Sequence, residues 1–132
     1  MEITRAYVKS ILPHRDPEGH KGTFGKVYCL CGAVGYTGAP VLAASAAVRS
    51  GSGLVFLGVP KDIWPIVAVK CDSAMPSPLP SQQGKLALAA EDAVRAQIDG
   101  CDAVLIGCGM GRSEESDALT RRLIDMDKPL VL

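Results

Sequence analysis

The chain has 132 residues, of which 48% are hydrophobic and 21% charged, with 14 basic residues against 14 acidic ones. A domain of this length buries about two-thirds of the surface of its unfolded chain, enough for one hydrophobic core. The balanced charge and the aromatic content of 5% give no electrostatic reason to expect a nucleic-acid partner. No apolar run approaches the roughly 20 residues of a membrane span, and residues 1–19 carry charges throughout instead of a signal peptide. We therefore expect a cytoplasmic protein with no membrane partner.

The most informative segment is residues 20–60, which holds eight of the 14 glycines. An expected strand at 26–31 is separated from an expected helix at 39–50 by a turn that contains Gly32, Gly35 and Gly38. Glycine has no Cβ, so such a turn lets backbone N–H groups approach a ligand closely. The N-terminus of the following helix carries a partial positive charge, which favours a phosphate or a carboxylate. The segment therefore predicts an anion-binding turn.

The helix at 39–50 has clear start signals, since Thr37 or Gly38 can cap it and Pro40 suits its first turn. Its apolar residues cover nearly every side, so we expect it to be buried and to pack closely on a sheet through its alanines. The apolar run at 54–59 is typical of a parallel strand covered on both faces. Strand, turn, helix and strand form a βαβ unit with a right-handed crossover, which predicts the α/β class.

The rest of the chain continues this alternation. Residues 61–70 predict a short helix that Pro65 interrupts, and residues 71–83, rich in proline and serine, predict a loop. The patterns that follow predict a helix at 85–97, a strand at 103–107, a helix that starts at Ser113 and a strand that opens at 130–132.

A second glycine cluster, residues 107–111, follows the strand expected at 103–107. Its spacing departs from the dinucleotide-binding fingerprint, and the first cluster lacks the Gly-Lys-Ser/Thr ending of a P-loop. Each turn alone is equally well explained as a device that lets a helix pack close to its strand. Two such turns after parallel strands favour a ligand site more strongly, because ligands of open α/β sheets bind beyond the carboxyl ends of the strands.

The five cysteines are an odd number in a chain without a leader, which favours reduced thiols. We expect Cys29 and Cys31, which alternate along a strand, to face opposite sides of the sheet and to make a poor chelating pair. The other three, Cys71, Cys101 and Cys108, lie far apart in the sequence. The cysteines are therefore interpreted as small core residues, and no metal site is expected.

Several polar residues have both a functional and a structural interpretation. Lys21 either contacts a phosphate or is a solvated loop lysine. A structural hydrogen bond suits His20 better than proton transfer, and Arg49 complements the dipole at the end of its helix. Asp102 suits a turn before a strand. No carboxylate pair or Ser/His/Asp set stands out as catalytic.

Four segments of the sequence together resemble the motifs of a known protein family. They are His20-Lys21-Gly22-Thr23-Phe24-Gly25-Lys26, Gly38-Ala39, Arg49-Ser50-Gly51-Ser52-Gly53 and Ile106-Gly107-Cys108-Gly109-Met110-Gly111. In type and order they resemble the ADP/ATP-dependent NAD(P)H-hydrate dehydratase family, a branch of the ribokinase-like superfamily that repairs hydrated nicotinamide cofactors. The resemblance runs from about Leu12 to the last residue, and Cys108 stands where the family usually has proline.

This resemblance implies a fold and a set of site residues. The implied fold is a three-layer, ribokinase-like (Rossmann-like) and mostly parallel sheet with helices on both faces, of which residues 1–132 form the N-terminal portion of one domain. Ala39 and Gly109 match positions that the family uses to hold the hydrate, and we expect Gly38 and Gly107 beside them to bind substrate as well. Lys21 is the candidate phosphate contact.

The family also carries two later motifs, Asp-Ala-Asp-Gly/Ala and Asn-x-Gly-Thr-Gly-Asp, whose last aspartate is its catalytic base. Neither motif occurs in this sequence. The resemblance therefore implies no catalytic residue and no metal ligand in this chain, and we expect the chain alone to be inactive.

The function implied is the ADP- or ATP-dependent dehydration of (S)-NAD(P)H-hydrate to NAD(P)H, a lyase reaction, with or without Mg²⁺. A phosphoryl group activates the hydrate hydroxyl, phosphate leaves, and this chain supplies the substrate-side half. Two alternatives stay open: a ribokinase-like kinase of a sugar or vitamin alcohol, and a non-catalytic dinucleotide-binding or assembly module. Uncovered strand edges and apolar faces predict a homo-oligomer.

Overall fold

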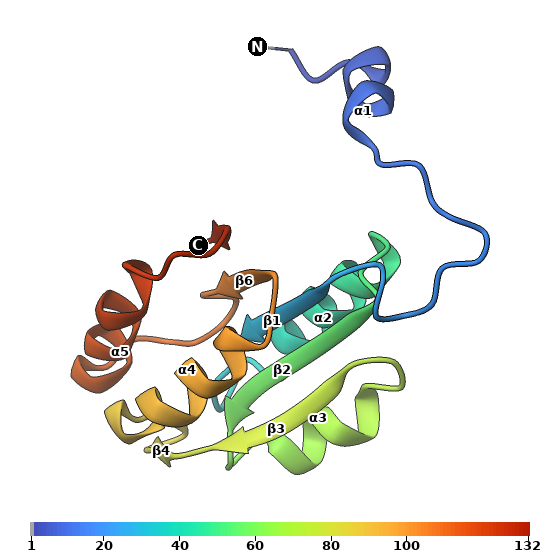
Figure 1. Cartoon of the computed structure of the whole chain (residues 1–132). Coiled ribbons are helices and arrows are strands. Elements are labelled where there is room, and N and C mark those ends of the chain that lie inside the picture. The colour runs from blue at the N-terminus through green and yellow to red at the C-terminus, as the bar shows by residue number, and fades with distance from the viewer. Residues whose placement is uncertain (1) are drawn as a thin grey trace.

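The computed structural model describes residues 2–132, which form a five-stranded parallel sheet with helices on both faces (Figure 1). The strand order is β3-β2-β1-β6-β7, and a separate antiparallel hairpin pairs β4 with β5. The strands are β1 (Lys26–Leu30), β2 (Leu54–Pro60), β3 (Met75–Leu79), β4 (Ser81–Gln82), β5 (Lys85–Leu86), β6 (Ala103–Ile106) and β7 (Leu130–Val131). The predicted α/β sheet is confirmed.

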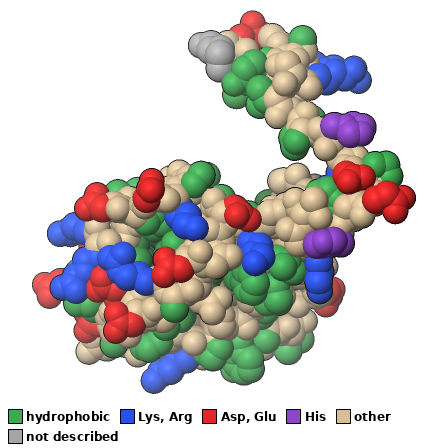
Figure 2. Space-filling view, in the orientation of Figure 1, with side chains coloured by type: hydrophobic (Ala, Val, Ile, Leu, Met, Phe, Trp, Pro, Cys, Tyr) green, Lys and Arg blue, Asp and Glu red, His purple; other side chains and the backbone are tan. Residues whose placement is uncertain are grey.

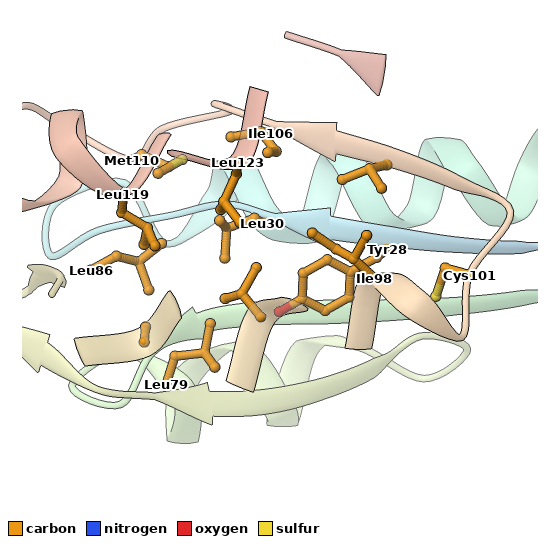
Figure 3. Close-up of a cluster of buried hydrophobic side chains, with 13 residues drawn as sticks. Tyr28, Leu30, Leu79, Leu86, Ile98, Cys101, Ile106, Met110, Leu119 and Leu123 are labelled. Atoms are coloured by element: carbon orange, nitrogen blue, oxygen red, sulfur yellow. The ribbon is translucent and has the colours of Figure 1, made fainter. Parts of the chain in front are cut away.

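Two hydrophobic cores flank this sheet, because successive side chains of a strand point to opposite faces. One core lies under α2 and α3 and includes Cys29, Cys31 and Leu57 from the strands. The other lies under η1, α4 and α5 and includes Tyr28 and Leu30 (Figure 3). The helices are α1 (Arg5–Ile11), α2 (Gly38–Arg49), α3 (Trp64–Lys70), the 3₁₀ turn η1 (Leu88–Ala90), α4 (Glu91–Asp99) and α5 (Glu114–Ile124). Helix, sheet and helix make the three predicted layers.

The second core contains one polar group that is fully buried. The Tyr28 ring lies within the cluster (Figure 3), and its hydroxyl has no hydrogen-bond partner among the described residues. Burial raises the pKa of this hydroxyl, so Tyr28 stays neutral at physiological pH. Its role is to fill the core with an aromatic ring.

The loop predicted at 71–83 is wrong, because most of it forms β3 and β4. Strand β3 pairs only with β2, so one row of its backbone groups needs no partner in the sheet. Pro76 and Pro78 alternate along β3, and their missing N–H groups belong to that outer row. The outward direction is visible at Pro76, whose carbonyl accepts the indole N–H of Trp64 at 2.9 Å. Proline is therefore compatible with this strand because it is an edge strand.

Two helix predictions also need correction. The helix predicted at 85–97 begins only at Glu91, because Lys85 and Leu86 form β5 of the hairpin. Gln83 and Gly84 connect this hairpin with φ of 49° and 73°, the positive values that a two-residue β-turn requires. The helix predicted at 61–70 begins at Trp64, and Pro65 occupies its first turn instead of interrupting it.

Helix α2 has the predicted bounds to within one residue, but its burial differs from expectation. Only Pro40 and Ala44 are fully buried in it, and Leu42 is 73% exposed. The reason is that α2 is an outer layer, which covers the sheet with one side only. Thr37 is its N-terminal cap residue and makes no side-chain capping bond.

The prediction that Cys29 and Cys31 face opposite sides of the sheet is wrong. Both thiols lie in the core under α2 and α3. Residues two positions apart on a strand share a face, and it is the residue between them that points the other way. All five cysteines of the chain are free, and four of them are buried or partly buried, whereas Cys108 is exposed.

An N-terminal arm extends from this body. Helix α1 lies apart from the sheet at the end of an extended segment (Figure 1), and it buries none of its residues. On the face of the body seen in Figure 2, positive and negative side chains are interspersed. Within residues 2–132, no helix combines the length and the apolar character that crossing a bilayer requires.

Candidate functional site

The strand order of the sheet reverses direction at β1. From β1 the chain passes through α2 to β2 on one side, and it later returns to the other side of β1 with β6. Helices α2 and α4 cover opposite faces, so the loops that leave the carboxyl ends of β1 and β6 diverge. Open α/β sheets bind ligands in the crevice at such a switch point. Both glycine turns stand here.

The two glycine turns are in direct contact. The N–H of Gly32, in the first turn, donates to the carbonyl of Cys108, in the second, at 2.9 Å. A Cβ atom added to Gly109 would lie 2.6 Å from the Cβ of Ala39 and 3.1 Å from that of Tyr36. The structure therefore brings Ala39 and Gly109, the two residues expected to hold the hydrate, side by side.

Other glycines of these turns face open space. A Cβ added to Gly35, Gly38 or Gly107 would meet nothing within 4 Å. Gly35 and Gly107 have φ of 89° and 123°, conformations that favour glycine. The N-terminus of α2, a helix of 12 residues, opens beside them with its partial positive charge. The Ala39 N–H is already donated to the Tyr36 carbonyl at 3.2 Å, so the ligand-facing backbone is that of the open glycines.

Lys85 is a residue of this region that sequence reasoning missed. The β4–β5 hairpin reaches the first turn, where the Val34 N–H donates to the Gly84 carbonyl at 2.8 Å. The Cε of Lys85 lies 3.3 Å from the Cβ position of Gly111. Lys85 forms no ion pair with any residue from 2 to 132. The hairpin thus brings an unpaired positive charge to the second turn. The local sequence signal for this hairpin was the Gln83-Gly84 dipeptide, which forms its turn.

Lys21 lies at the other end of the sheet. It precedes β1, and its carbonyl packs where a Cβ of Gly53, just before β2, would stand. The five residues of β1 separate this end from the glycine turns by about 16 Å. The structure therefore does not bring Lys21 together with Ala39 and Gly109, and a phosphate held at the turns is out of its reach.

The residues around Lys21 have structural roles. The ring Nδ1 of His20 accepts the Gly22 N–H at 3.1 Å, as the structural interpretation predicted. The carboxylate of Asp102 accepts the Lys26 N–H at 2.7 Å and so joins the starts of β1 and β6. Arg49 lies in the last turn of α2, as predicted. The motif at 20–26 therefore shapes the entry into β1.

One hollow on the surface lies beside the second turn and is lined in part by Lys85, Ser113 and Glu114, and other hollows lie away from the two turns. One of these, between the ends of α2 and α3, is lined in part by Arg49, Lys70 and Asp72, and another lies between the N-terminal arm and the body. The switch point is the stronger candidate for a ligand site, because it combines accessible glycine backbone, the N-terminus of α2 and the Lys85 side chain. Among residues 2–132, no group of three His, Cys, Asp or Glu side chains is placed to hold a metal ion. The crevice is thus suited to binding and orienting an anion.

Comparison with known proteins places this crevice in a family context. The profile of the NAD(P)H-hydrate dehydratase family matches residues 27–132, which include both glycine turns. The chain is 37% identical over 123 residues to the bifunctional NAD(P)H-hydrate repair enzyme Nnr of Moorella thermoacetica, a match that covers 92% of this chain and 23% of that protein. It is also 37% identical to the ADP-dependent (S)-NAD(P)H-hydrate dehydratase of Cenarchaeum symbiosum, with 91% and 42% covered. The chain spans less than half the length of these relatives.

Solved structures give the same assignment. The ADP/ATP-dependent NAD(P)H-hydrate dehydratase of Bacillus subtilis, co-crystallised with ATP and Mg²⁺, aligns with a TM-score of 0.75 at 29% identity, over 96% of this chain and 43% of that one. A ribokinase-like superfamily protein of Enterococcus faecalis aligns with a TM-score of 0.78 at 18% identity, over 97% and 43%, which supports the fold alone. The predicted ribokinase-like fold is confirmed. Sequence profile, relatives and fold agree, and the chain belongs to the NAD(P)H-hydrate dehydratase family.

Proposed function

We propose that this chain supplies the substrate-binding part of an enzyme that dehydrates (S)-NAD(P)H-hydrate to NAD(P)H. The observation that carries the proposal is the contact between the two glycine turns at the switch point, with Ala39 against Gly109. Membership of the dehydratase family supports the reaction. ADP or ATP, with or without Mg²⁺, is the proposed phosphoryl donor, in line with the relatives named for ADP dependence and the Bacillus subtilis enzyme crystallised with ATP and Mg²⁺.

The crevice suits a dinucleotide substrate for physical reasons. Its pyrophosphate can lie at the N-terminus of α2, where the open backbone of Gly35 and Gly38 admits close approach. The Lys85 ammonium at the second turn adds a positive charge on the other side. The small side chain of Ala39 lets the backbone of the second turn pack against the start of α2, so the ring that carries the hydroxyl is proposed to lie beside this contact. Gly107 and Gly109 contribute backbone there instead of side chains.

We further propose that the chain binds this substrate without converting it. The groups gathered at the crevice are backbone amides, the Lys85 ammonium and the Cys108 thiol, and none of them is proposed as the base that takes a proton from the hydroxyl. A positioned base supplies about 10² to 10⁴ in rate, and the relatives contain more than twice the length of this chain. The base is proposed to lie in sequence that the relatives have and these 132 residues do not.

The test uses the purified chain with hydrated NADH and ADP. Titration calorimetry measures binding of the hydrate, and the absorbance of reduced nicotinamide measures turnover. We expect binding without an increase in absorbance. An absence of binding would overturn the proposed substrate site, while ADP-dependent turnover would overturn the claim that the base lies elsewhere. Phosphorylation of a sugar or vitamin alcohol would favour the kinase alternative.

We also propose that the chain self-associates through the open edge of its sheet. Strand β7 pairs only with β6, and Val131 and Leu132 are 64% and 71% exposed. Unpaired edges with apolar side chains recruit further strands. Light scattering is expected to give a mass above that of the monomer, and Val131→Lys should shift it toward the monomer. A monomeric wild type would contradict this proposal. The cytoplasmic location stays a prediction.

A further inference from the structure

Two cysteines lie near each other just beyond the ends of the two central strands. Strand β1 ends at Leu30 and Cys31 follows it, whereas β6 ends at Ile106 and Cys108 is the second residue after it. The two segments still run together there, because the Gly32 N–H donates to the Cys108 carbonyl at 2.9 Å. Backbones joined by such a hydrogen bond lie about 5 Å apart. A disulfide needs about 4.4–6.8 Å between Cα atoms.

The turn after β6 also brings the Cys108 side chain near the Cys31 thiol. The Cys31 thiol lies in the core under α2 and α3. Gly107, with φ of 123°, takes the chain out of strand geometry just before Cys108. Both the backbone and the thiol of Cys108 affect the pKa of the Cys31 thiol, which is consistent with this closeness. Cys29 shares that face but pairs with Leu105, three residues before Cys108, so it is a worse partner.

The two thiols differ in access. Cys108 is exposed at the surface of the second turn, whereas Cys31 is 0% exposed. Burial, followed by the neighbouring thiols of Cys29 and Cys108, raises the pKa of Cys31. A dissolved oxidant therefore meets Cys108 first. Cys31 is then placed to react with the oxidised sulfur from inside the protein.

We propose that Cys31 and Cys108 are a reversible thiol–disulfide pair that locks the second glycine turn to the end of β1. The oxidant is hydrogen peroxide. The Cys108 thiolate attacks a peroxide oxygen, so that an S–O bond forms, the O–O bond breaks and hydroxide leaves as water after taking a proton. The Cys31 thiol then attacks the sulfenic sulfur, so that the S–S bond forms, the S–O bond breaks, and the departing hydroxide takes the thiol proton and leaves as a second water. Two thiols are oxidised and one peroxide is reduced to two waters.

The position of the pair gives the bond a consequence for the crevice. Cys108 stands between Gly107 and Gly109 in the second turn. A bond to Cys31 would therefore fix the turn that packs against Ala39, where a Cβ of Gly109 would meet the Ala39 side chain. Exchange with a dithiol reverses the bond, because a thiolate attacks either sulfur through a mixed disulfide. The proposal about the bond itself does not depend on the proposed substrate.

The test maps the thiols of the purified chain after equimolar hydrogen peroxide. Free thiols are blocked with a maleimide in denaturant, the chain is digested, and the peptides are weighed. The wild type is expected to lose two hydrogen atoms in intact mass and to yield a peptide in which Cys31 is joined to Cys108. Dithiothreitol should restore both thiols. Cys71→Ser, which changes a partly buried cysteine outside the pair, is the matched control and should behave as the wild type does.

Two variants separate the steps. Cys108→Ser should keep all its remaining thiols, and Cys31→Ala, checked for folding by circular dichroism, should stop at a sulfenic acid on Cys108 that dimedone traps. A bond to any other cysteine, a bond only between chains, or over-oxidation of Cys108 with Cys31 still free in the wild type would overturn the proposal. These readouts involve no nucleotide, so they fail or succeed separately from the proposed function.

Discussion

The turn after β1 and the turn after β6 each contain a packed glycine and an open one, but the packed glycines meet different neighbours. A Cβ on Gly32 would lie 2.8 Å from the Cδ1 of Ile63 and 2.9 Å from the Cγ of Pro40. A Cβ on Gly109 would lie 2.6 Å from the Cβ of Ala39. The Ile63 methyl group is the end of a rotatable side chain. The Ala39 Cβ is fixed to the backbone of α2, and it moves only if the helix moves.

This difference separates two uses of glycine in one crevice. In the first turn, a Cβ on Gly32 would meet one side-chain end that can rotate, that of Ile63, and the stiff ring of Pro40 in α2. In the second turn, a Cβ on Gly109 would meet the Cβ of Ala39, which cannot move without the helix. The open glycines, Gly35 and Gly107, serve neither packing purpose and leave backbone accessible. Substitutions at packed and open positions should therefore differ in size, and some should differ in sign.

The largest effect is expected for Gly109→Val. The substitution places a β-branched side chain at φ of 69° and drives it into Ala39. Backbone strain and overpacking each cost about 1–3 kcal/mol, so the free energy of unfolding should fall by about 2–6 kcal/mol. Urea denaturation measures this change. A loss below about 1 kcal/mol would show that the two turns are not fitted to each other as described.

Gly32→Ala should have the second largest effect. Its φ of 87° carries strain similar to that at Gly109. Of the two side chains that the new Cβ would meet, Ile63 ends in a rotatable methyl group, and only the Pro40 ring is stiff. We expect a loss of about 1–3 kcal/mol in the free energy of unfolding, mostly from the backbone. The same urea titration on Gly109→Ala is the matched comparison, and the comparison between turns breaks down if Gly32→Ala proves the more damaging of the two.

Ala39→Leu should act on binding more than on stability. The longer side chain extends from the first turn of α2, beside the contact with Gly109, and obstructs the approach of a ligand to the two turns. The affinity for hydrated NADH should fall at least about tenfold, which corresponds to about 1.4 kcal/mol. Leu42→Ala is the control, because Leu42 lies on the same helix with 73% of its surface exposed. Equal affinities in the wild type and a folded Ala39→Leu chain would remove Ala39 from the site.

Gly38→Ala should have the smallest effect, in the opposite direction. Gly38 begins α2 without a positive φ, and a Cβ there would meet no atom within 4 Å. Replacing glycine by alanine at a compatible position stabilises a protein by about 0.4–1 kcal/mol, mainly by restricting the unfolded chain. Thermal or urea denaturation will detect this gain. A loss of stability would mean that an atom packs against this position in solution.

Parts of the fold were predictable because their signals are local. The apolar runs of β1 and β2 and the capping residues of α2 placed these elements to within about one residue. Strand β3 was not predictable in this way, since Pro76 and Pro78 are acceptable only at a sheet edge, and edge position depends on the whole topology. The error at Cys29 and Cys31 was of another kind, because strand periodicity alone gives their common face.

The residues of the candidate site also differ in whether a local sequence signal could predict them. The resemblance to the family pointed to Ala39 and Gly109, and the switch point explains why they meet. Lys85 could not be found from its own segment, because the hairpin that carries it is positioned by contacts with the first turn. The separation of Lys21 from the turns could have been predicted, since a residue before β1 lies at the amino end of a parallel sheet, and its phosphate contact stays a prediction.

The prolines of β3 also limit how copies of this chain can join. Along that edge the backbone lacks the N–H groups of Pro76 and Pro78, and the Pro76 carbonyl is already occupied by Trp64. The proposed self-association would therefore use the β7 side. Two copies joined through their β7 edges would each present only a proline edge outward. Pairing between sheets should therefore stop at a closed, symmetric pair and not continue into a fibre.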